Sequence, residues 1–328
     1  MQSFGAECAR KFELKMYNSN EDSEKGTRMF FLETSGRSWI TPREACCLES
    51  ASRMSNLQVT VLLISSFLDL NENSSCYLFQ QYPNIHFYTI DLQNAFQHTP
   101  LEKIIERKEF KTSQHKAIHL SDMLRLAIIY KNGGFYSDLD TVTIKDLSQF
   151  HNIIGQTNMK DTTLDYLSKL EHFCTIIGVD NLKNMSAKHL QNAEFKFEKN
   201  HKLLWKTMEE IAKRYEGRHR IEIGPLFITS VVKSFYNVTE IEHFKNQELE
   251  IVPNDYFYPA KAYEISKLWT IDAQSEDDWK RLLKDSYIIH FYSSQTNSLV
   301  VQRNVNYELY SYLGPKYCPV AYWSSESF

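Results

Sequence analysis

The stretch from Ser121 to Asp140 limits the fold more than any other part of the chain. Its first half, 121–131, reads as a helix, with Ser121 predicted as the N-terminal cap and Gly133 as the left-handed residue that ends it. A short strand follows over 135–137, and then come Asp138 and Asp140. Two carboxylates at i and i+2 of an extended strand end point to the same side of the backbone. The pattern predicts a paired oxygen site, the chemistry that Mg²⁺ or Mn²⁺ with a diphosphate requires.

Strand-like and helix-like segments alternate before this site. Strands are expected at Phe30–Leu32, 59–64 and 85–90, and helices from the Thr41–Glu44 capping box to about Met54 and over 101–107. Such alternation favours an α/β fold with a mostly parallel, doubly wound sheet covered on both faces. Asp138 and Asp140 would then lie at the carboxyl end of a strand, where sheets of this kind bind ligands.

Several motifs in one order resemble a known family. They are Ser121-Asp122-x-x-Arg125, Gly133-Gly134-x-Tyr136-x-Asp138-x-Asp140, Gly224-Pro225, Phe257-Tyr258-Pro259, Tyr287-Ile288-Ile289-His290 and Tyr317-Cys318-Pro319. This order is similar to that of the alpha-1,4-glycosyltransferase family with an Asp-x-Asp motif, which includes alpha-1,4-galactosyltransferases and alpha-1,4-N-acetylglucosaminyltransferases. The similarity runs from about Met29 to Val320. It implies a GT-A-like nucleotide-sugar-binding fold and a single catalytic domain.

The resemblance also implies an activity and a set of site residues. The activity is metal-dependent, retaining transfer of galactose or an N-acetylhexosamine from a UDP-sugar to a glycosphingolipid or glycan acceptor, in alpha-1,4 linkage. The implied donor-binding residues are Phe30, Leu32, Ser35, Asp122, Arg125, Tyr136, Asp138 and Asn192. The implied residues for Mn²⁺ (or Mg²⁺) are Asp138, Asp140 and His290, with Asp140 as the direct ligand and Asp138 directed to the ribose or a metal-bound water. No catalytic nucleophile is assigned.

Plainer readings stand beside these assignments. Asp122 and Arg125, three residues apart on one helix face, also suit a surface ion pair, and Phe30 suits the core. Asp138-Leu139-Asp140-Thr141-Val142 fits the nucleophile motif of haloacid-dehalogenase-like phosphatases, which need a distal lysine and a second acidic pair. Asp277-Asp278 lies in a polar, helix-like stretch instead. A catalytically impaired glycosyltransferase-like protein is the third reading.

The domain organisation is predicted as a disordered stem remnant over 1–28 and a catalytic domain over 29–328. Leu147–Gly155 resembles Leu170–Gly178, offset by 23 residues, and the repeat does not continue. We expect residues from about 156 to 190 to form a surface insert whose ends return close together. Its apolar cluster Phe173, Ile176 and Ile177 would be poorly buried or would compete with Phe150, Ile153 and Ile154.

Charge, cysteines and targeting signals bound the rest. The net charge of −4 disfavours nucleic acid as a partner. Six cysteines without Cys-x-x-Cys spacing argue against structural zinc and leave their pairing open. Sequons at Asn73, Asn184 and Asn237 support a lumenal location mildly. No apolar run approaches the roughly 18–20 residues of a membrane span. Family members are single-span Golgi proteins, so we expect the N-terminus of this chain to be incomplete.

Overall fold

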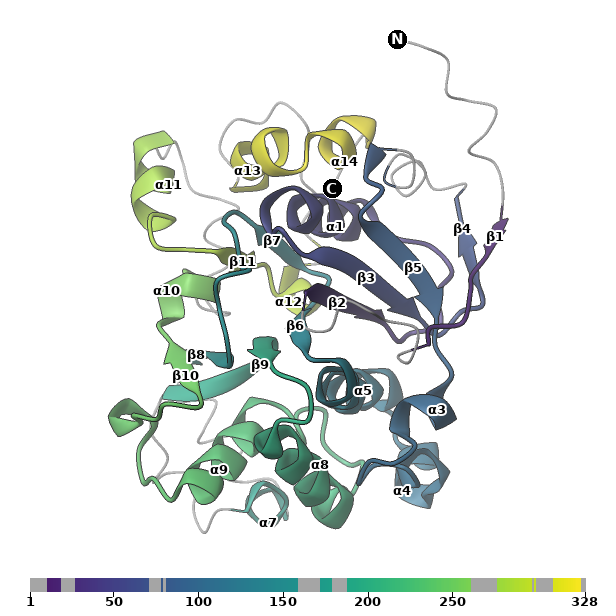
Figure 1. Ribbon diagram of the computed structural model, residues 1–328, viewed down its shortest axis with the longest axis vertical. Coiled ribbons are helices and arrows are strands. Elements are labelled where there is room, and N and C mark those ends of the chain that lie inside the picture. Colours follow the sequence, from purple (N-terminus) through teal and green to yellow (C-terminus); the bar gives the residue numbers. More distant parts are fainter. Residues whose placement is uncertain are drawn as a thin grey trace.

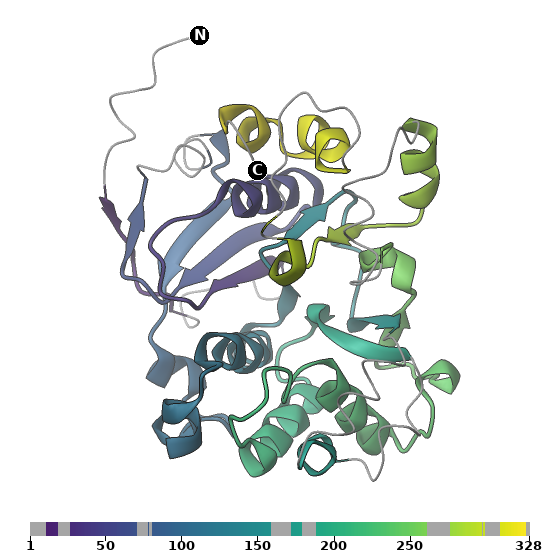
Figure 2. The same ribbon diagram turned by 180° about the vertical axis from the view of Figure 1, so that it is seen from behind.

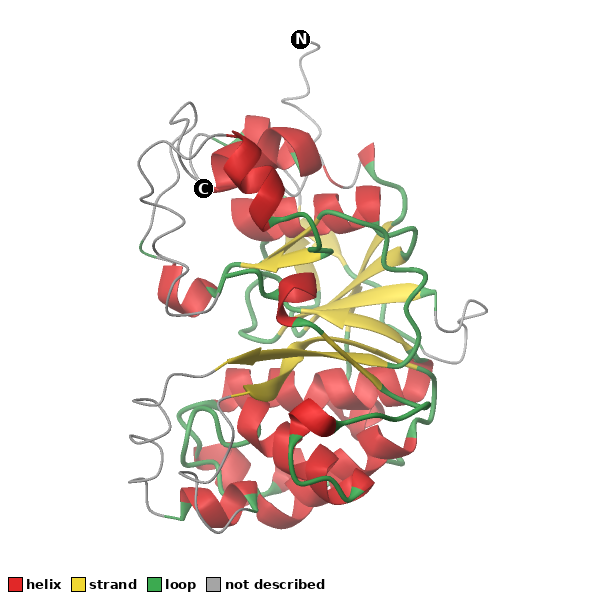
Figure 3. Ribbon diagram, turned by 90° about the vertical axis from the view of Figure 1, so that its left-hand side faces the viewer, coloured by secondary structure: helices red, strands yellow, loops and turns green. Residues whose placement is uncertain are grey.

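The computed structural model describes residues 11–18, 27–70, 78, 81–158, 172–178, 188–260, 276–296, 298 and 309–325. They form an α/β fold in which helices cover both faces of a central sheet, seen from the front in Figure 1 and from behind in Figure 2. Viewed edge-on, the strands lie between two helical layers (Figure 3). The predicted fold class, a mostly parallel and doubly wound sheet, is confirmed.

The central sheet has seven strands. Across the sheet they are β10 (Glu250–Val252), β8 (Ile153–Asn158), β9 (Lys188–Phe197), β6 (Gly134–Ser137), β2 (Arg28–Glu33), β3 (Gln58–Leu63) and β5 (Ile85–Thr89). Strands β6, β2, β3 and β5 are mutually parallel, whereas β9 runs antiparallel to both of its neighbours. Two small antiparallel pairs flank the sheet, β1 (Lys11–Glu13) with β4 (Phe67–Asp69) and β7 (Thr141–Thr143) with β11 (Ile288–His290).

The helices divide between the two faces. On one face lie α1 (Pro42–Met54), α13 (Leu309–Tyr317) and α14 (Pro319–Ser324), and on the other α5 (Lys116–Asn132), α7 (Phe173–Ile177), α8 (Lys202–Arg214) and α9 (Pro225–Tyr236) (Figure 1). The short helices are α3 (Leu92–Phe96), η1 (Ile104–Glu106), α4 (Lys108–Thr112), η3 (Ile241–His243), α10 (Asn254–Phe257), α11 (Glu276–Leu282) and α12 (Ser293–Thr296).

Strand β2 explains why both faces need helices. Met29 and Phe31 pack into the core on the α1 side, while Phe30 and Leu32 pack into the core on the α5 side. A strand buried on both faces reads as a continuous apolar run, which is the pattern found here. Helix α1 begins with the predicted capping box, in which the Glu44 amide donates to the Thr41 hydroxyl (3.3 Å) and the Thr41 amide donates to the Glu44 carboxylate (2.8 Å).

The helix that precedes the acidic pair begins earlier than predicted. It starts at Lys116, so Ser121 lies inside it and does not cap it. The Ser121 hydroxyl instead accepts a hydrogen bond from Nη2 of Arg125 (2.8 Å). Gly133 ends the helix with a φ of 69°, a positive angle that glycine adopts without strain. Over 101–107 the predicted helix is reduced to turns and η1.

The expectation of a disordered segment over 1–28 is wrong for residues 11–18. Strand β1 pairs with β4, and the Tyr17 amide donates to the Thr89 carbonyl (2.8 Å). The residues of β1 are exposed and pair through their backbone, so they carry no apolar pattern that would reveal them. Residues 1–10 and 19–26 lie outside the described residues.

The repeat differs from expectation in its burial. The ends of the predicted insert do meet, because Asn158 pairs with Lys188, but 156–158 and 188–190 belong to β8 and β9. In the second copy, the side chains of Phe173, Ile176 and Ile177 are 0%, 1% and 0% exposed. The expectation of poor burial is therefore wrong for these three residues. Residues 159–171 and 179–187 lie outside the described part of the chain.

The two copies of the repeat also adopt different structures. Ile153-Ile154-Gly155 belongs to strand β8, whereas Ile176 and Ile177 end helix α7 and Gly178 follows with a φ of 73°. Helix α7 packs against α8 and α9 on the α5 side of the sheet. Neighbouring elements, rather than the shared local sequence, therefore select strand or helix here.

Candidate active site

A cavity of about 580 Å³ opens at the carboxyl ends of β2 and β6. The predicted site residues that line it are Leu32, Ser35, Arg125, Asp138, Asp140 and His290. Phe30 is absent from its lining, because its side chain is fully buried in the core, where its ring lies 6.0 Å from that of Tyr17. The plain core reading of Phe30 is therefore the one that the structure supports. The cavity occupies the position where parallel α/β sheets bind ligands.

Three potential metal ligands converge in this cavity. One side-chain atom each from Asp138, Asp140 and His290 lies within 4.8 Å of the others. Nε2 of His290 is 2.9 Å from Oδ1 of Asp140, and Oδ2 of Asp140 accepts a hydrogen bond from the Ser293 amide (2.6 Å). Mn²⁺ can bind both carboxylates and the imidazole, and Mg²⁺ can bind the carboxylate oxygens. The residues present therefore fit the predicted divalent cation.

Pairing of β7 with β11 brings His290 to the acidic motif. His290 lies opposite Thr141, the residue after Asp140, and the Phe291 amide donates to the Asp140 carbonyl (2.9 Å). The Tyr292 ring stacks on the His290 ring, with centroids 4.3 Å apart and planes 19° apart. Backbone pairing and ring stacking together hold the imidazole in one orientation.

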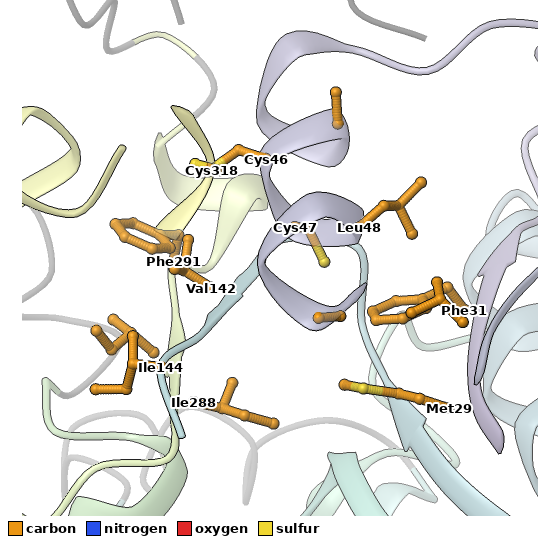
Figure 4. Close-up of a cluster of buried hydrophobic side chains, with 14 of the residues drawn as sticks. Met29, Phe31, Cys46, Cys47, Leu48, Val142, Ile144, Ile288, Phe291 and Cys318 are labelled. Atoms are coloured by element: carbon orange, nitrogen blue, oxygen red, sulfur yellow. A yellow bond between two sulfur atoms is a disulfide. The ribbon is translucent and has the colours of Figure 1, made fainter. Parts of the chain in front are cut away.

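An apolar cluster behind these two strands supports them. Figure 4 shows Val142 of β7 and Ile288 of β11 among buried side chains, together with Phe291. The same view shows the disulfide between Cys46 of α1 and Cys318, which settles a pairing that the sequence left open. The potential metal ligands thus project from a packed core, which limits how far they can move.

Arg125 links the helix α5 to the acidic motif. Its Nη1 lies 3.1 Å from Oδ1 of Asp138, and its Nη2 lies 3.4 Å from Oδ1 of Asp122. The Tyr136 hydroxyl donates to the same Oδ1 of Asp138 (2.6 Å), and the guanidinium lies 4.5 Å from the centroid of the Tyr136 ring. Among the described residues, Oδ2 of Asp138 accepts no hydrogen bond, so this oxygen is available to a ligand.

Asn192 completes this cluster from strand β9. Its side-chain amide donates to Oδ1 of Asp122 (2.7 Å), and its backbone carbonyl accepts from Nη1 of Arg125 (2.7 Å). Because Asp122 and Arg125 are 7% and 5% exposed, they are not a surface ion pair, and the plainer reading of this pair is wrong. Burial raises the pKa of Asp122 to about 6, and the positive charge of Arg125 lowers it only in part. Their roles toward a donor remain a prediction.

Opposite charges hold His290 and Asp140 together. Burial alone would lower the pKa of His290, but Asp140 and Glu194 outweigh it, so this pKa is raised. Burial would likewise raise the pKa of Asp140, yet His290 and the Ser293 amide lower it below its ordinary range. Without a cation, the imidazolium neutralises the carboxylate. A cation bound between them would take the place of the proton on His290.

Glu194 is a site residue that the sequence reading missed. It lies on β9 opposite Ser137, with a wholly buried side chain, and burial raises its pKa to about 8. Its Oε1 is 3.8 Å from Nδ1 of His290. The sequence pattern that could have indicated this residue is a carboxylate between Ala193 and Phe195 in an otherwise apolar segment. Charged side chains are rarely fully buried unless they are paired.

Arg220 is a second missed residue, and it lines the cavity from the turn before α9. The buried carboxylate of Glu222 holds this turn by accepting hydrogen bonds from the backbone amides of Glu216, Gly217, Arg218 and His219. The structure shows that Glu222 shapes the turn rather than facing the cavity.

Asp277, one member of the acidic pair considered for the phosphatase reading, does not line the cavity. Asp277 lies on α11, where its side chain is 80% exposed and pairs with Lys280 at 3.5 Å. None of the described residues that line the cavity is a lysine. The structure therefore gives this reading no support.

Two family models match the chain. Residues 41–160 match the "Glycosyltransferase sugar-binding region containing DXD motif", and residues 196–325 match the "Alpha 1,4-glycosyltransferase conserved region". The first region contains Asp138 and Asp140, and the second contains His290. The two regions thus meet at one cavity.

Individual proteins show the same similarity. Lactosylceramide 4-alpha-galactosyltransferase of Mus musculus is 24% identical over 300 residues, which cover 90% of this chain and 75% of that protein. Alpha-1,4-N-acetylglucosaminyltransferase of Homo sapiens is 23% identical over 300 residues, covering 89% of this chain and 78% of that protein. Among solved structures, the galactosyltransferase LgtC with donor and acceptor sugar analogues overlaps at a TM-score of 0.41 and 10% identity, covering 81% of this chain and 87% of that chain. From the two family regions and these sequence relatives, the chain carries both regions of the alpha-1,4-glycosyltransferases with a DXD motif and is a glycosyltransferase.

Proposed function

We propose that the protein is a divalent-cation-dependent, retaining glycosyltransferase whose catalytic domain spans residues 29–328. It moves galactose or an N-acetylhexosamine from a UDP-sugar to a glycolipid or glycan acceptor in alpha-1,4 linkage. The observation that carries this proposal is the convergence of Asp138, Asp140 and His290 within 4.8 Å at a cavity large enough for a nucleotide-sugar.

In this proposal, Asp140 and His290 bind Mn²⁺ or Mg²⁺ directly, and Asp138 binds it through Oδ2 or through water. When bound, the cation supplies Lewis-acid stabilisation of the negative charge that grows on the leaving diphosphate. Arg125 fixes the Asp138 carboxylate through Oδ1, which leaves the other oxygen directed to the ligand. Holding the reacting groups in position is the main contribution of such a site.

The donor sugar is placed in the same proposal beside Asp122, Arg125 and Asn192. Asn192 donates to Oδ1 of Asp122, the oxygen that also faces Arg125, and thereby fixes the orientation of this carboxylate. A hydroxyl-rich sugar is a suitable ligand for a fixed carboxylate, because sugar hydroxyls donate hydrogen bonds. Leu32 and Ser35 lie on the cavity wall at the end of β2, where they suit contacts to the nucleoside.

The acceptor and the location are proposed from the relatives. The Mus musculus relative is named for 4-alpha-galactosyl transfer to lactosylceramide, and a glycosphingolipid acceptor in the Golgi lumen follows for this chain by similarity. Asn237 of the third sequon follows α9 in an exposed position that suits glycosylation. No helix within the described ranges is long and apolar enough to cross a bilayer.

A donor screen tests the proposal. The protein is incubated with UDP-galactose, UDP-N-acetylgalactosamine and UDP-N-acetylglucosamine, with Mn²⁺, Mg²⁺ or EDTA, and with lactosylceramide or free glycan acceptors. We expect one donor to be consumed in the presence of a divalent cation and the product to carry an alpha-1,4 linkage by NMR. Equal rates with EDTA would contradict the cation dependence, and a beta-linked product would contradict retention.

A further inference from the structure

Glu194 has no hydrogen-bond partner in the described structure although its side chain is fully buried. Neither Oε1 nor Oε2 forms a hydrogen bond, and the exposed fraction of the residue is 0%. Leaving a buried acceptor unsatisfied is destabilising, and more so for a charged group. We therefore expect a ligand-bound state in which this carboxylate gains a hydrogen-bond partner.

Two buried groups beside Glu194 are candidate partners, the Tyr258 hydroxyl and the unused nitrogen of His290, and the second of these belongs to the proposed cation site. Nδ1 of His290 is also buried without a hydrogen bond, and it lies 3.8 Å from Oε1 of Glu194. On the other side of the ring, Nε2 faces Oδ1 of Asp140 at 2.9 Å. The imidazole therefore lies between two carboxylates, one at the cavity and one in the interior.

Cation binding determines which nitrogen carries the proton. A nitrogen that coordinates a metal must give its lone pair to it, so it carries no proton. If Nε2 binds the cation between Asp138 and Asp140, the remaining ring proton is on Nδ1. Nδ1–H then needs an acceptor in the interior, and Glu194 is the carboxylate that faces it.

We propose that Glu194 is a positioning residue that accepts a hydrogen bond from Nδ1 of His290 when Nε2 binds the divalent cation. This role rests on the proposed cation site. The register of β9 against β6 places Glu194 beside the acidic motif, and the Asp138 amide donates to the neighbouring Ala193 carbonyl (3.0 Å). Closing the 3.8 Å separation to hydrogen-bond length requires a movement of about 1 Å. Removing such an outer partner of a metal-bound histidine typically weakens metal binding 10- to 100-fold.

Mn²⁺ affinity, measured by electron paramagnetic resonance of free Mn²⁺ in the absence of substrates, tests this role. We expect Glu194→Ala to raise the Kd for Mn²⁺ by 10- to 100-fold. Glu194→Gln keeps the size and one neutral acceptor oxygen, so its effect should be smaller. The control is Glu49→Gln, at another fully buried carboxylate, which caps α14 by accepting from the amides of Val320 and Ala321. It should lower Tm and leave the Kd for Mn²⁺ unchanged.

The outcomes separate this role from the proposed function. If the wild-type protein binds no Mn²⁺, the cation site itself is refuted, and the role of Glu194 with it. If the wild type binds Mn²⁺ and a folded Glu194→Ala binds it equally well, only the role of Glu194 is refuted. Should both variants fail to fold, ¹⁵N NMR of the wild type with Mg²⁺ decides. A proton on Nδ1 of His290 supports the role, and a proton on Nε2 overturns it.

Discussion

Nε2 of His290 lies 2.9 Å from Oδ1 of Asp140, although the two residues belong to different family regions of the sequence. We expected Asp138, Asp140 and His290 to share one cleft, and the structure confirms that convergence. The pairing of β7 with β11 produces it, because this register sets His290 beside the residue that follows Asp140. A predicted metal site thus depends on an antiparallel strand pair outside the main sheet.

Asp140→Asn should abolish cation-dependent transfer and leave the fold intact. The change removes one charged ligand and no packing atoms, so the circular dichroism spectrum should match that of the wild type. Transfer is measured with saturating Mn²⁺, and Asp277→Asn on the exposed surface of α11 is the matched control. Wild-type activity of the Asp140 variant would refute the assignment of this ligand.

Arg125→Met should destabilise the protein and weaken donor binding together. The change leaves the carboxylates of Asp122 and Asp138 without the guanidinium that they share. Breaking a buried ion pair in this way costs about 3–5 kcal/mol of folding free energy. Chemical denaturation measures the free energy of unfolding, and initial rates give KM for the UDP-sugar. Lys213→Met, which removes an exposed partner of Glu210, should change stability by less than about 1 kcal/mol. Equal effects of the two changes would contradict the prediction.

The contribution of Glu194 to the stability of the metal-free protein should fall as the pH rises from about 5 to 8. The pKa of Glu194 is raised to about 8 from an ordinary value of 4.5, so within this window the folded state binds more protons than the unfolded state. Stability from this group is complete below pH 4.5 and is lost as the pH rises through the folded pKa, with a slope of at most about 1.4 kcal/mol per pH unit. Urea titrations in EDTA measure it.

Glu194→Gln supplies the control for this pH dependence. A side chain that does not titrate cannot contribute to the slope, so the difference between wild type and variant isolates the contribution of Glu194. Identical slopes for the two proteins between pH 5 and 8 would show that Glu194 keeps its ordinary pKa in the folded state.

Phe173→Ala should destabilise the protein by about 3–5 kcal/mol, the usual cost of truncating a buried aromatic side chain. Its ring packs in the core on the α5 side and lies 5.6 Å from the His219 ring. Cys174→Ala, at the partly exposed neighbouring position, should cost far less. An effect of Phe173→Ala below about 0.5 kcal/mol would restore the view that the second copy of the repeat is a dispensable surface insert.

Features that depend on local chemistry could be predicted from the sequence. The capping box at Thr41, the apolar strand β2 and the acidic pair after β6 each have a pattern that depends on near neighbours alone. His290 required the family resemblance, because a single histidine on an apolar strand carries no such pattern. The ordered motifs together were enough to predict most residues of the candidate site.

Features that depend on tertiary partners could not be predicted. Glu194 lies in the interior only because β9 pairs between β6 and β8, and the sequence does not give this strand order. Phe173 is buried only because α8 and α9 lie over it. Ser121 resembles a helix cap until the preceding turn, from Lys116, is seen to be helical as well. In each case the deciding contact comes from an element that the local sequence does not encode.

Strand β9 carries residues toward both halves of the site, since Asn192 contacts Asp122 on α5 whereas Glu194 faces His290 on β11. A displacement of β9 would therefore move the groups proposed for the sugar and for the cation at the same time. Linkage requires that if donor binding shifts this strand and strengthens cation affinity by some factor, cation binding strengthens donor affinity by the same factor. Strand β9 therefore connects the two proposed binding positions, so that binding of either ligand could raise the affinity of the protein for the other.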